Sequence, residues 1–370
     1  MWVYRSDLVS AETIAPGSLV GVTDERGKFL GTALYSGASQ IAIRMISRDR
    51  VDDLDLLLRR RIAEAIAYRT QVVRDSDACR LVFSEADFLP GLIVDRYNDL
   101  LALQMLTQAM DAEPARQAIV TELQQQLEPA GIVERVDPKI RELEQLAPRS
   151  SGLLRGDRMA TVFTMNGVKF HYSSEEGQKT GAFLDQRENY AAAAQYARGE
   201  ALDVFCYQGG FALHLARMGS KVTGVDSSRP ALEVADRNAT LNDREIDWIE
   251  ANAFDLLRDY SAAGQQYDMI VLDPPAFAKS KRNLNTALRG YKELNLRALK
   301  LLRPGGVLVT CSCSYHVSGG DFLEVVAEAA RDVHRNLRIL ENRGQARDHP
   351  ILLNVPETTY LKCVIANVKL

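Results

Sequence analysis

The sequence predicts an α/β protein with a doubly wound, seven-stranded sheet in its C-terminal half, preceded by a small β module and an α+β domain. Two patterns indicate this fold class. From residue 201 onward, short apolar runs alternate with helical stretches, as in sheets whose parallel strands are joined by helices. Before residue 50, strand-like runs follow one another with turn signals between them. The 370 residues, 46% apolar and 25% charged, suit two or three globular domains.

Composition argues against several classes of protein. No apolar run reaches the roughly 18 residues needed to cross a bilayer, and the N-terminus lacks a signal-peptide pattern, so we expect a cytoplasmic protein. The five cysteines form no C-x-x-C pair, which disfavours a disulfide framework and a metal site. Because the net charge is −4, any surface that binds nucleic acid must be local.

Residues 1–50 are predicted to form the β module. Strands are expected at 18–23, 31–35 and 41–47, and the sequence DERG at 24–27 is a hairpin signal between the first two. Basic and acidic residues are balanced in this segment. The charge pattern therefore supports a structural cap and a binding role equally.

Residues 51–174 are predicted to form the α+β domain, and this segment shows no catalytic cluster. Helices are expected at 51–70 and 113–127, and strands at 79–84, 91–96, 100–106, 131–135, 162–166 and 168–173. The dipeptide Asn166-Gly167 is a strong hairpin signal between the last two strands. A stretch rich in serine and glycine, 148–156, is predicted to be a linker.

Residues 175–370 carry the regular alternation. Strands are expected at 201–205, 221–225, 246–250, 267–272, 306–312, 336–342 and 359–366. Helices are expected at 210–218, 229–241, 253–262, 284–302 and 321–335. The last two strands make a hairpin pair at one edge of the sheet. Because ligands of such sheets bind beyond the carboxyl ends of the parallel strands, the residues that follow each strand are the candidate site.

The first strand–helix–strand unit, 201–226, has the features of a nucleotide-binding unit. A turn containing Gly209 and Gly210 follows the first strand, and glycines allow a ligand to approach the backbone closely. Asp226 ends the second strand, where a carboxylate can accept hydrogen bonds from two ribose hydroxyls. The glycines do not match G-x-G-x-x-G, so a dinucleotide is disfavoured. Any βαβ unit with a glycine turn remains the alternative on this segment alone.

The run DPPAF follows the fourth strand of the predicted sheet. Pro274 and Pro275 remove two backbone donors and stiffen the turn, leaving carbonyls that can accept from an amine. Asp273 can bond a base edge or protonate a ring nitrogen, and Phe277 offers a stacking surface for a planar base. The alternative is a proline-rich turn without a ligand.

The run TCSCS follows the fifth strand and contains two cysteines. A lone cysteine is most often a small core residue. Residues two apart in a strand share a face, so Cys311 points the same way as Cys313 but lies deeper. We therefore expect only Cys313 to reach the site.

A basic stretch follows the DPPAF run: eight basic residues and one acid lie between 279 and 303. Lys279, Lys281 and Arg282 are adjacent to the Asp273 turn, so a positive surface there suits a phosphate-bearing substrate. The alternative is a solvated helix face.

The segment EEGQKTGAFLDQRENY, 175–190, precedes the glycine turn. Its glycines and polar residues suit a loop that folds over a cofactor. The candidate contacts in this loop are Thr180, Gly181, Phe183, Gln186 and Arg187. A capped helix with a solvated charged face is the alternative.

Together, DVFCYQGGF, VDSS, DPPAF and TCSCS resemble the class I S-adenosylmethionine-dependent RNA methyltransferases. The sequence is most similar to the bacterial 23S rRNA 5-methylcytosine methyltransferase family, which has an N-terminal PUA domain. Further similar stretches are KTGAFLDQREN, ASQIAIRM, DFLPGLIVDRY, LRGYKELN and DHPILLNVPETTYLKC. The resemblance covers nearly the whole chain and implies a PUA module, a central α+β domain and a Rossmann-like catalytic domain.

The same resemblance implies a cofactor, a partner and site residues. It implies S-adenosylmethionine as cofactor, S-adenosylhomocysteine as product and 23S rRNA as partner, without a metal or a membrane, and it leaves a homodimer open. Cys313 takes the place of the nucleophile, and Asp273 is the second catalytic residue. The implied cofactor contacts are Asp203, Phe205, Gly209, Gly210, Asp226, Ser227, Asn252, Ala253 and Asp273.

Three departures from the family accompany this resemblance. Asn252 stands where an aspartate is common, and Cys206 stands where serine is common. Cys311 adds a second thiol near the expected nucleophile. The family usually has one more strand and a basic stretch before the equivalent of Trp2-Val3-Tyr4, so we expect either that the β module lacks its first strand or that the true start lies upstream.

Carbon-5 of cytosine is too weak a nucleophile to take a methyl group directly, so the reaction needs a thiolate that adds to carbon-6. An exocyclic-amine or guanine RNA methyltransferase would need no cysteine. A non-catalytic RNA-binding or ribosome-assembly protein would need no cofactor site. These two remain the alternatives, and a dehydrogenase is a weaker third.

Overall fold

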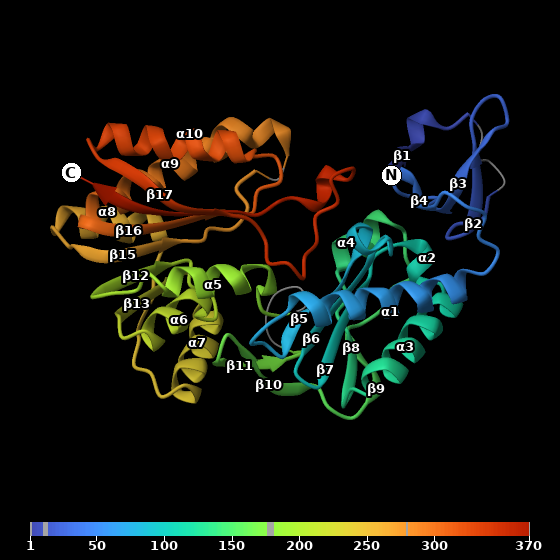
Figure 1. The fold of residues 1–370 in the computed structure, drawn as a ribbon, viewed down its shortest axis with the longest axis horizontal. Coiled ribbons are helices and arrows are strands. Elements are labelled where there is room, and N and C mark those ends of the chain that lie inside the picture. Colours follow the sequence, from blue (N-terminus) through green and yellow to red (C-terminus); the bar gives the residue numbers. More distant parts are fainter. Residues whose placement is uncertain (1, 10–13, 176–180, 279, 370) are drawn as a thin grey trace. The chain divides into compact units, whose positions relative to one another are not determined.

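The structure, a computed structural model, describes residues 2–9, 14–175, 181–278 and 280–369. The chain divides into two compact units. The first comprises Met1–Thr164, Tyr172–Ala182 and Arg347–Thr358. The second comprises Met165–His171, Phe183–Ala346 and Thr359–Leu370. A segment near the C-terminus thus belongs to the first unit, and the path of the chain can be followed by colour in Figure 1.

The N-terminal module is a four-stranded antiparallel sheet with the order β1-β4-β3-β2. The strands are β1 (Trp2–Tyr4), β2 (Leu19–Thr23), β3 (Phe29–Tyr35) and β4 (Ile41–Ser47). The three predicted strands are therefore confirmed. The predicted turn is held by Asp24, whose carboxylate accepts hydrogen bonds from the backbone of Arg26 and Lys28. Sequence analysis missed β1 because three residues are too few to show an alternation.

The rest of the first unit is built on a five-stranded sheet with the order β5-β6-β7-β8-β9. The strands are β5 (Ala78–Phe83), β6 (Leu92–Tyr97), β7 (Leu100–Met105), β8 (Gly131–Glu134) and β9 (Gly152–Gly156). The helices are α1 (Leu54–Val72), α2 (Gln108–Asp111), α3 (Glu113–Leu127) and α4 (Pro138–Leu143). A separate two-stranded sheet pairs β10 (Ala160–Met165) with β11 (Val168–Ser173) around the predicted Asn-Gly turn.

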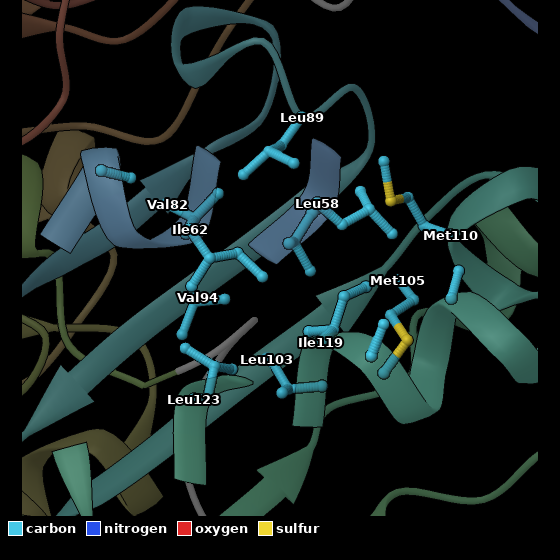
Figure 2. Close-up of a cluster of buried hydrophobic side chains, with 14 of the residues drawn as sticks. Leu58, Ile62, Val82, Leu89, Val94, Leu103, Met105, Met110, Ile119 and Leu123 are labelled. Atoms are coloured by element: carbon cyan, nitrogen blue, oxygen red, sulfur yellow. The ribbon is translucent and has the colours of Figure 1, made fainter. Parts of the chain in front are cut away.

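One apolar core joins this sheet to its helices, as Figure 2 shows. Leu58 and Ile62 of α1 meet Ile119 of α3 there, next to Val82 of β5 and Leu103 of β7. The apolar period of each helix places these side chains on one face. Burial of that face against the sheet is what holds the two helices in place.

The linker predicted at 148–156 is wrong in its second half. Residues 152–156 form β9, which pairs antiparallel with β8 through Gly131–Gly156 and Ile132–Arg155. The glycine at 156 has a φ of +82° and ends the strand. The serine and glycine content that suggested a linker instead marks the two ends of a short edge strand.

The second unit contains a seven-stranded sheet with the order β14-β13-β12-β15-β16-β18-β17. The strands are β12 (Glu200–Val204), β13 (Lys221–Asp226), β14 (Asp247–Glu250), β15 (Tyr267–Leu272), β16 (Leu302–Ser312), β17 (Asn336–Arg343) and β18 (Lys362–Lys369). The first five are parallel, and β18 pairs antiparallel with both β16 and β17. The doubly wound sheet with an antiparallel pair at its edge is therefore confirmed.

Helices cover both faces of this sheet. Their bounds are α5 (Arg187–Ala194), α6 (Gly210–Arg217), α7 (Arg229–Leu241), α8 (Ala253–Ala262), α9 (Leu284–Leu301) and α10 (Gly319–Asp332). Figure 1 shows α9 and α10 over one face and α5, α6 and α7 over the other. In the part of the chain that the structure describes, no helix has the length and apolar character needed to cross a membrane.

A buried arginine connects three segments of the first unit. The Arg69 side chain is 2% exposed, and its guanidinium forms two hydrogen bonds with the Asp87 carboxylate, at 2.5 and 2.7 Å. It also donates to the backbone oxygens of Arg80 and Asp348, at 2.8 and 2.9 Å. Through these bonds Arg69 links the segment Arg347–Thr358 to α1 and β5.

Replacing Arg69 with methionine should lower the free energy of unfolding of the protein by about 3–5 kcal/mol, because it leaves the Asp87 charge buried and unpaired. Arg60→Met is the matched control. Arg60 lies on the same helix and contacts Glu64, and each of these two side chains is 65% exposed. The control should change stability by less than about 0.5 kcal/mol. Urea denaturation measures both, and equal effects of the two substitutions would contradict the role given to Arg69.

Candidate functional site

Parallel register brings the candidate residues of the second unit to one edge of the sheet. Val204, near the end of β12, is level with Val225 of β13 and Leu272 of β15. Leu272 is in turn level with Thr310 of β16. The turns that follow these four strands therefore begin side by side at their carboxyl ends. This is where doubly wound sheets bind ligands.

The turn after β12 is tightly bound to the neighbouring strand. The backbone nitrogens of Phe205 and Cys206 both donate to the Val225 oxygen, at 2.8 and 3.0 Å. Phe205, Tyr207 and Gly209 all have positive φ angles, of 67°, 48° and 85°. Non-glycine residues rarely adopt this conformation, and when they do they often lie at ligand sites.

Both glycines of this turn contact aromatic rings. A Cβ on Gly210 would lie 2.4 Å from the Tyr190 ring, and a Cβ on Gly209 would lie 3.0 Å from the Trp248 ring. Sequence analysis assigned these glycines to the approach of a ligand. The structure adds a packing reason: α6 begins at Gly210, directly against Tyr190 of α5.

Asp226 lies at the end of β13 with a fixed carboxylate. One oxygen accepts from the backbone nitrogen of Tyr207 at 3.0 Å, and the other from that of Ser228 at 2.9 Å. Ser228 in turn caps α7, so Ser227 lies between a fixed carboxylate and a helix start. Each carboxylate oxygen retains a lone pair, and the pair can accept hydrogen bonds from two adjacent hydroxyl groups.

Asp203 on β12 is a fully buried acid beneath the glycine turn. One carboxylate oxygen accepts from the Ala212 backbone nitrogen at 2.8 Å, and the other has no hydrogen-bond partner among the described residues. Burial is the main cause that raises the pKa of Asp203 to about 8; the hydrogen bond from Ala212 opposes this increase, and the nearby charges of Asp273 and Asp226 add to it. A cationic group of a ligand would relieve this unfavourable state.

Asp273, which follows β15, is part of the same acidic cluster. Its surface is partly exposed, yet dense surroundings desolvate its carboxyl and raise the pKa to about 7. The neighbouring Asp185 charge also raises this pKa, and the Gln186 amide lowers it. We call Asp185, Asp203, Asp226 and Asp273 the acidic cluster. Of these carboxyls, those of Asp203 and Asp273 are partly protonated at neutral pH.

The segment before α5 contributes Asp185 to this cluster. Asp185 is held by the Tyr360 hydroxyl, which donates to its carboxylate at 2.6 Å. The Phe183 ring packs edge-on against Tyr207 of the glycine turn, with centroids 5.0 Å apart. Arg187 is buried, and its backbone oxygen accepts from the Asn166 amide at 2.8 Å.

Two other candidates of this segment lie outside the described part of the second unit. Gly181 belongs to the first unit, where a Cβ would meet the Tyr172 ring at 2.8 Å. Thr180 lies outside the described residues.

Asn252 lies at the end of β14 and caps the next helix. Its side-chain oxygen accepts from the backbone nitrogens of Phe254 and Asp255, at 2.9 and 3.3 Å. Ala253, the first residue of α8, is buried beneath it. The capping bonds use the oxygen of the Asn252 amide, so the group that it can offer to a ligand is the amide N–H.

The two remaining turns meet at Cys313. Its thiol donates to the backbone oxygen of Pro274 across a distance of 3.9 Å. Tyr291 of α9 connects the same turns: its hydroxyl is 3.0 Å from the Ser312 hydroxyl and 2.9 Å from that of Ser314. Ser314 also accepts from the backbone of Ala278 at 3.2 Å. The DPPAF turn and the cysteine are therefore held together by a buried polar network.

Exposure distinguishes Cys313 from the other cysteines, all of which lie in the described part of the chain. Cys313 is half-buried, whereas Cys79, Cys206, Cys311 and Cys363 are buried. Burial raises the pKa values of the Cys206 and Cys311 thiols well above their ordinary value. Cys311 also faces Cys363 across the β16–β18 pair. Neither of these thiols is available as a thiolate near neutral pH.

The turn residue Phe277 packs against helix α9. Its ring lies 4.8 Å from that of Tyr291 and contacts Gly290. Pro274 is buried and Pro275 exposed. Part of the Phe277 ring is therefore used for packing, which fixes the turn, and part stays exposed.

The predicted basic surface is smaller than its eight residues suggested. Lys292, Arg297 and Arg303 form ion pairs with carboxylates. Lys281 and Arg282 are exposed beside the DPPAF turn, in a short 3₁₀ helix, Lys281–Asn283. Lys279 lies outside the described residues. Within the described part of the chain, no group of three or more His, Cys, Asp or Glu residues is arranged to hold a metal ion.

Asp185, Tyr291 and Lys362 belong to the site but were not predicted from the sequence. The first two lie in segments that the sequence does distinguish, the 175–190 loop and the basic stretch. Their roles depend on partners from other elements, which spacing along one segment cannot reveal. Only the resemblance of LRGYKELN and of the segment ending TTYLKC pointed to Tyr291 and Lys362.

Comparison with known proteins gives two family models that match the chain. One, described as S-adenosylmethionine-dependent methyltransferase, matches residues 117–362. The other, described as a PUA-like domain, matches residues 1–48.

Relatives and solved structures extend the similarity over nearly the whole chain. "Ribosomal RNA large subunit methyltransferase I" of Shewanella denitrificans is 40% identical over 99% of this chain and 95% of its own length. The protein of that name from Tolumonas auensis is 41% identical over 98% and 94%. The structure of SMU.776 complexed with SAH has a TM-score of 0.84 at 19% identity, covering 99% and 95% of the two chains. At this identity the structural likeness shows the fold alone.

Iodoacetamide should alkylate Cys313 first in the folded protein, because the other four thiols are buried. Peptide mass mapping after brief treatment near pH 7.5 measures which cysteine carries the label. Cys313→Ala should remain unlabelled over the same time, and all five cysteines should react in denaturant. Labelling of Cys206 or Cys311 at the rate of Cys313 would contradict the burial described here.

Proposed function

The chain belongs to the family of S-adenosylmethionine-dependent methyltransferases, and from this premise we propose that it methylates carbon-5 of a cytosine in 23S ribosomal RNA, with Cys313 as the nucleophile. The RNA substrate is supported by relatives of about 40% identity that are named for the RNA of the large ribosomal subunit. Methylation at carbon-5 of cytosine is supported by the position of the Cys313 thiol, which contacts the Pro274 carbonyl next to Asp273.

The acidic cluster suits the cofactor. S-adenosylmethionine carries a sulfonium and an ammonium group, and its ribose has two adjacent hydroxyls. Asp226 would accept from the ribose hydroxyls, and the unpartnered oxygen of Asp203 would accept from the ammonium group. The other proposed contacts are Thr180, Gly181, Phe183, Gln186, Arg187, Phe205, Gly209, Gly210, Ser227, Asn252, Ala253 and Asp273.

Covalent addition is the first step of the proposed reaction. The Cys313 thiolate attacks carbon-6 of the cytosine, and a sulfur–carbon bond forms. The displaced electron pair moves through carbon-4 to the ring nitrogen, which takes a proton from Asp273. A carboxyl with a pKa of about 7 is partly protonated at neutral pH, as a general acid requires. The addition leaves an enamine with a nucleophilic carbon-5.

Methyl transfer and release complete the cycle. When bound, the cofactor supplies a methyl group on a positively charged sulfur, which is the electrophile for carbon-5. Transfer of the carbon-5 proton to a water molecule then allows the bond between carbon-6 and Cys313 to break, and the electron pair returns to sulfur. Asp273 takes back the proton from the ring nitrogen, so both side chains end in their starting state. Buried contacts from Tyr291 and Ser314 keep the two turns in place throughout.

Binding of RNA is assigned to charges near the site. Lys281 and Arg282, with Lys279, would contact phosphates, and Pro274, Pro275 and Phe277 would contact the target base. We further propose three domains, 1–50, 51–174 and 175–370, and a cytoplasmic location. Whether the protein forms a homodimer is a question for measurement.

RNA containing 5-fluorocytidine tests the proposed adduct, because carbon-5 of this base carries no proton to lose and the covalent complex is trapped. The parent protein and Cys311→Ala should form a complex that survives denaturing electrophoresis, whereas Cys313→Ala should form none. A trapped complex with Cys313→Ala would remove Cys313 as the nucleophile. No complex with any variant, together with retained methyl transfer, would instead favour methylation of an exocyclic amine.

Affinity for S-adenosylmethionine should rise with pH between about 6 and 8.5. The pKa of Asp203 is raised to about 8, so its carboxyl is mostly neutral at pH 6 and becomes charged as the pH passes through 8. A cationic ligand favours the charged form, so binding near pH 7 should release a proton. Calorimetry in two buffers of different ionisation enthalpy measures that proton. Asp203→Asn should abolish its release, and an unchanged release in this variant would show that another group supplies it.

A further inference from the structure

We propose that Lys362 is a positioning residue for Cys313: its ammonium group lies beside the cysteine and stabilises the thiolate. This inference rests on the proposed role of Cys313 as the nucleophile. It adds a charge from the antiparallel part of the sheet to a site otherwise built from the parallel strands.

The backbone register brings Lys362 to the cysteine. Strand β18 begins at Lys362 and pairs antiparallel with β16, and Lys362 is level with Ser312, the residue before Cys313. The Lys362 Nζ donates to the backbone oxygen of Ser314, the residue after Cys313, at 2.6 Å. The ammonium group is therefore held at Ser314, on one side of the cysteine, and the backbone of Lys362 pairs with Ser312, on the other side.

A second hydrogen bond fixes the lysine head group. The Lys362 Nζ also donates to the Tyr360 backbone oxygen at 2.7 Å. These two carbonyls use two of the three ammonium protons, so a third is available to an anion. Because both bonds go to neutral oxygens, they locate the charge without neutralising it.

In the described part of the chain, the positive charge of Lys362 has no carboxylate partner. Among the described residues, none of its contacts is an ion pair, whereas Lys292 of α9 lies within 3.2 Å of two carboxylates. A half-buried cation without an anion is unfavourable. Burial lowers the pKa of Lys362 to about 8, and the Cys313 thiolate opposes that decrease. Lys362 is thus charged at neutral pH, and the thiolate is an anion placed to balance it.

Other groups near the thiol do not supply this charge. Tyr291 of α9 is neutral, because burial raises the pKa of its hydroxyl, and it bonds Ser312 and Ser314. The turn after β15 presents the Pro274 carbonyl and begins with Asp273, whose negative charge would disfavour a thiolate. Lys362, from β18, acts in the opposite direction. An opposite charge at close range lowers a thiol pKa by one unit or more.

The pH dependence of Cys313 alkylation tests the proposal without RNA or cofactor. Rates with iodoacetamide between pH 5.5 and 9.5 would be compared for the parent, Lys362→Met, Lys362→Gln and Lys362→Arg. Lys369→Met is the matched control, since it removes a charge from the exposed far end of the same strand. Glutamine can still donate to the Ser314 carbonyl, so it separates the loss of charge from the loss of the hydrogen bond.

The expected result is a charge effect. Lys362→Met and Lys362→Gln should move the midpoint of the rate profile upward by roughly one pH unit and slow alkylation at pH 7 about tenfold. Lys362→Arg and Lys369→Met should keep the parent profile. If Lys362→Met does not fold, Lys362→Gln alone decides the question.

A parent-like profile in Lys362→Gln would overturn the proposal, as would a shift in Lys362→Arg equal to that in Lys362→Gln. Failure of the proposed function gives a different result: Cys313→Ala would then retain methyl transfer. In that case the alkylation profiles would still report whether Lys362 controls the thiol. The two claims are therefore tested separately.

Discussion

The parallel register of β12, β13, β15 and β16 is the constraint on which the site depends. Each strand ends level with its neighbours, so residues far apart in the sequence meet at one edge of the sheet. Desolvation at that edge raises the pKa values of Asp203 and Asp273, which creates the affinity for a cationic ligand and an acid that is protonated near neutral pH. The glycine turn, which packs against the Tyr190 and Trp248 rings, lies at the same edge.

Charge at this edge is arranged in two regions. The acidic cluster lies around the glycine turn, where we propose that S-adenosylmethionine binds. Lys362 lies next to Cys313, where the proposed reaction needs a negative sulfur. The Tyr291 network holds the cysteine turn and the DPPAF turn between these regions. The same protein can thus stabilise a carboxyl in its neutral form and a thiol in its charged form.

Much of the fold could be predicted because apolar periodicity is a local signal. The parallel strands and the edge pair follow from it, and position along the chain distinguishes Cys313, which follows the end of β16, from Cys311, which lies deeper and is fully buried. The features that could not be predicted depend on partners in other segments of the chain. The segment at 152–156 pairs with β8, Gly210 is required by Tyr190, and Lys362 reaches Cys313 only through the register of β18. No spacing within one segment contains that information.

Identification of the methylated nucleoside tests the proposed function most directly. Purified 23S rRNA that lacks the modification would be incubated with the protein and S-adenosylmethionine, digested to nucleosides and analysed by mass spectrometry against synthetic standards. We expect 5-methylcytidine from the parent protein and none from Cys313→Ala. N4-methylcytidine or a methylguanosine as the product would contradict the proposed function, because neither reaction needs a cysteine that adds to carbon-6.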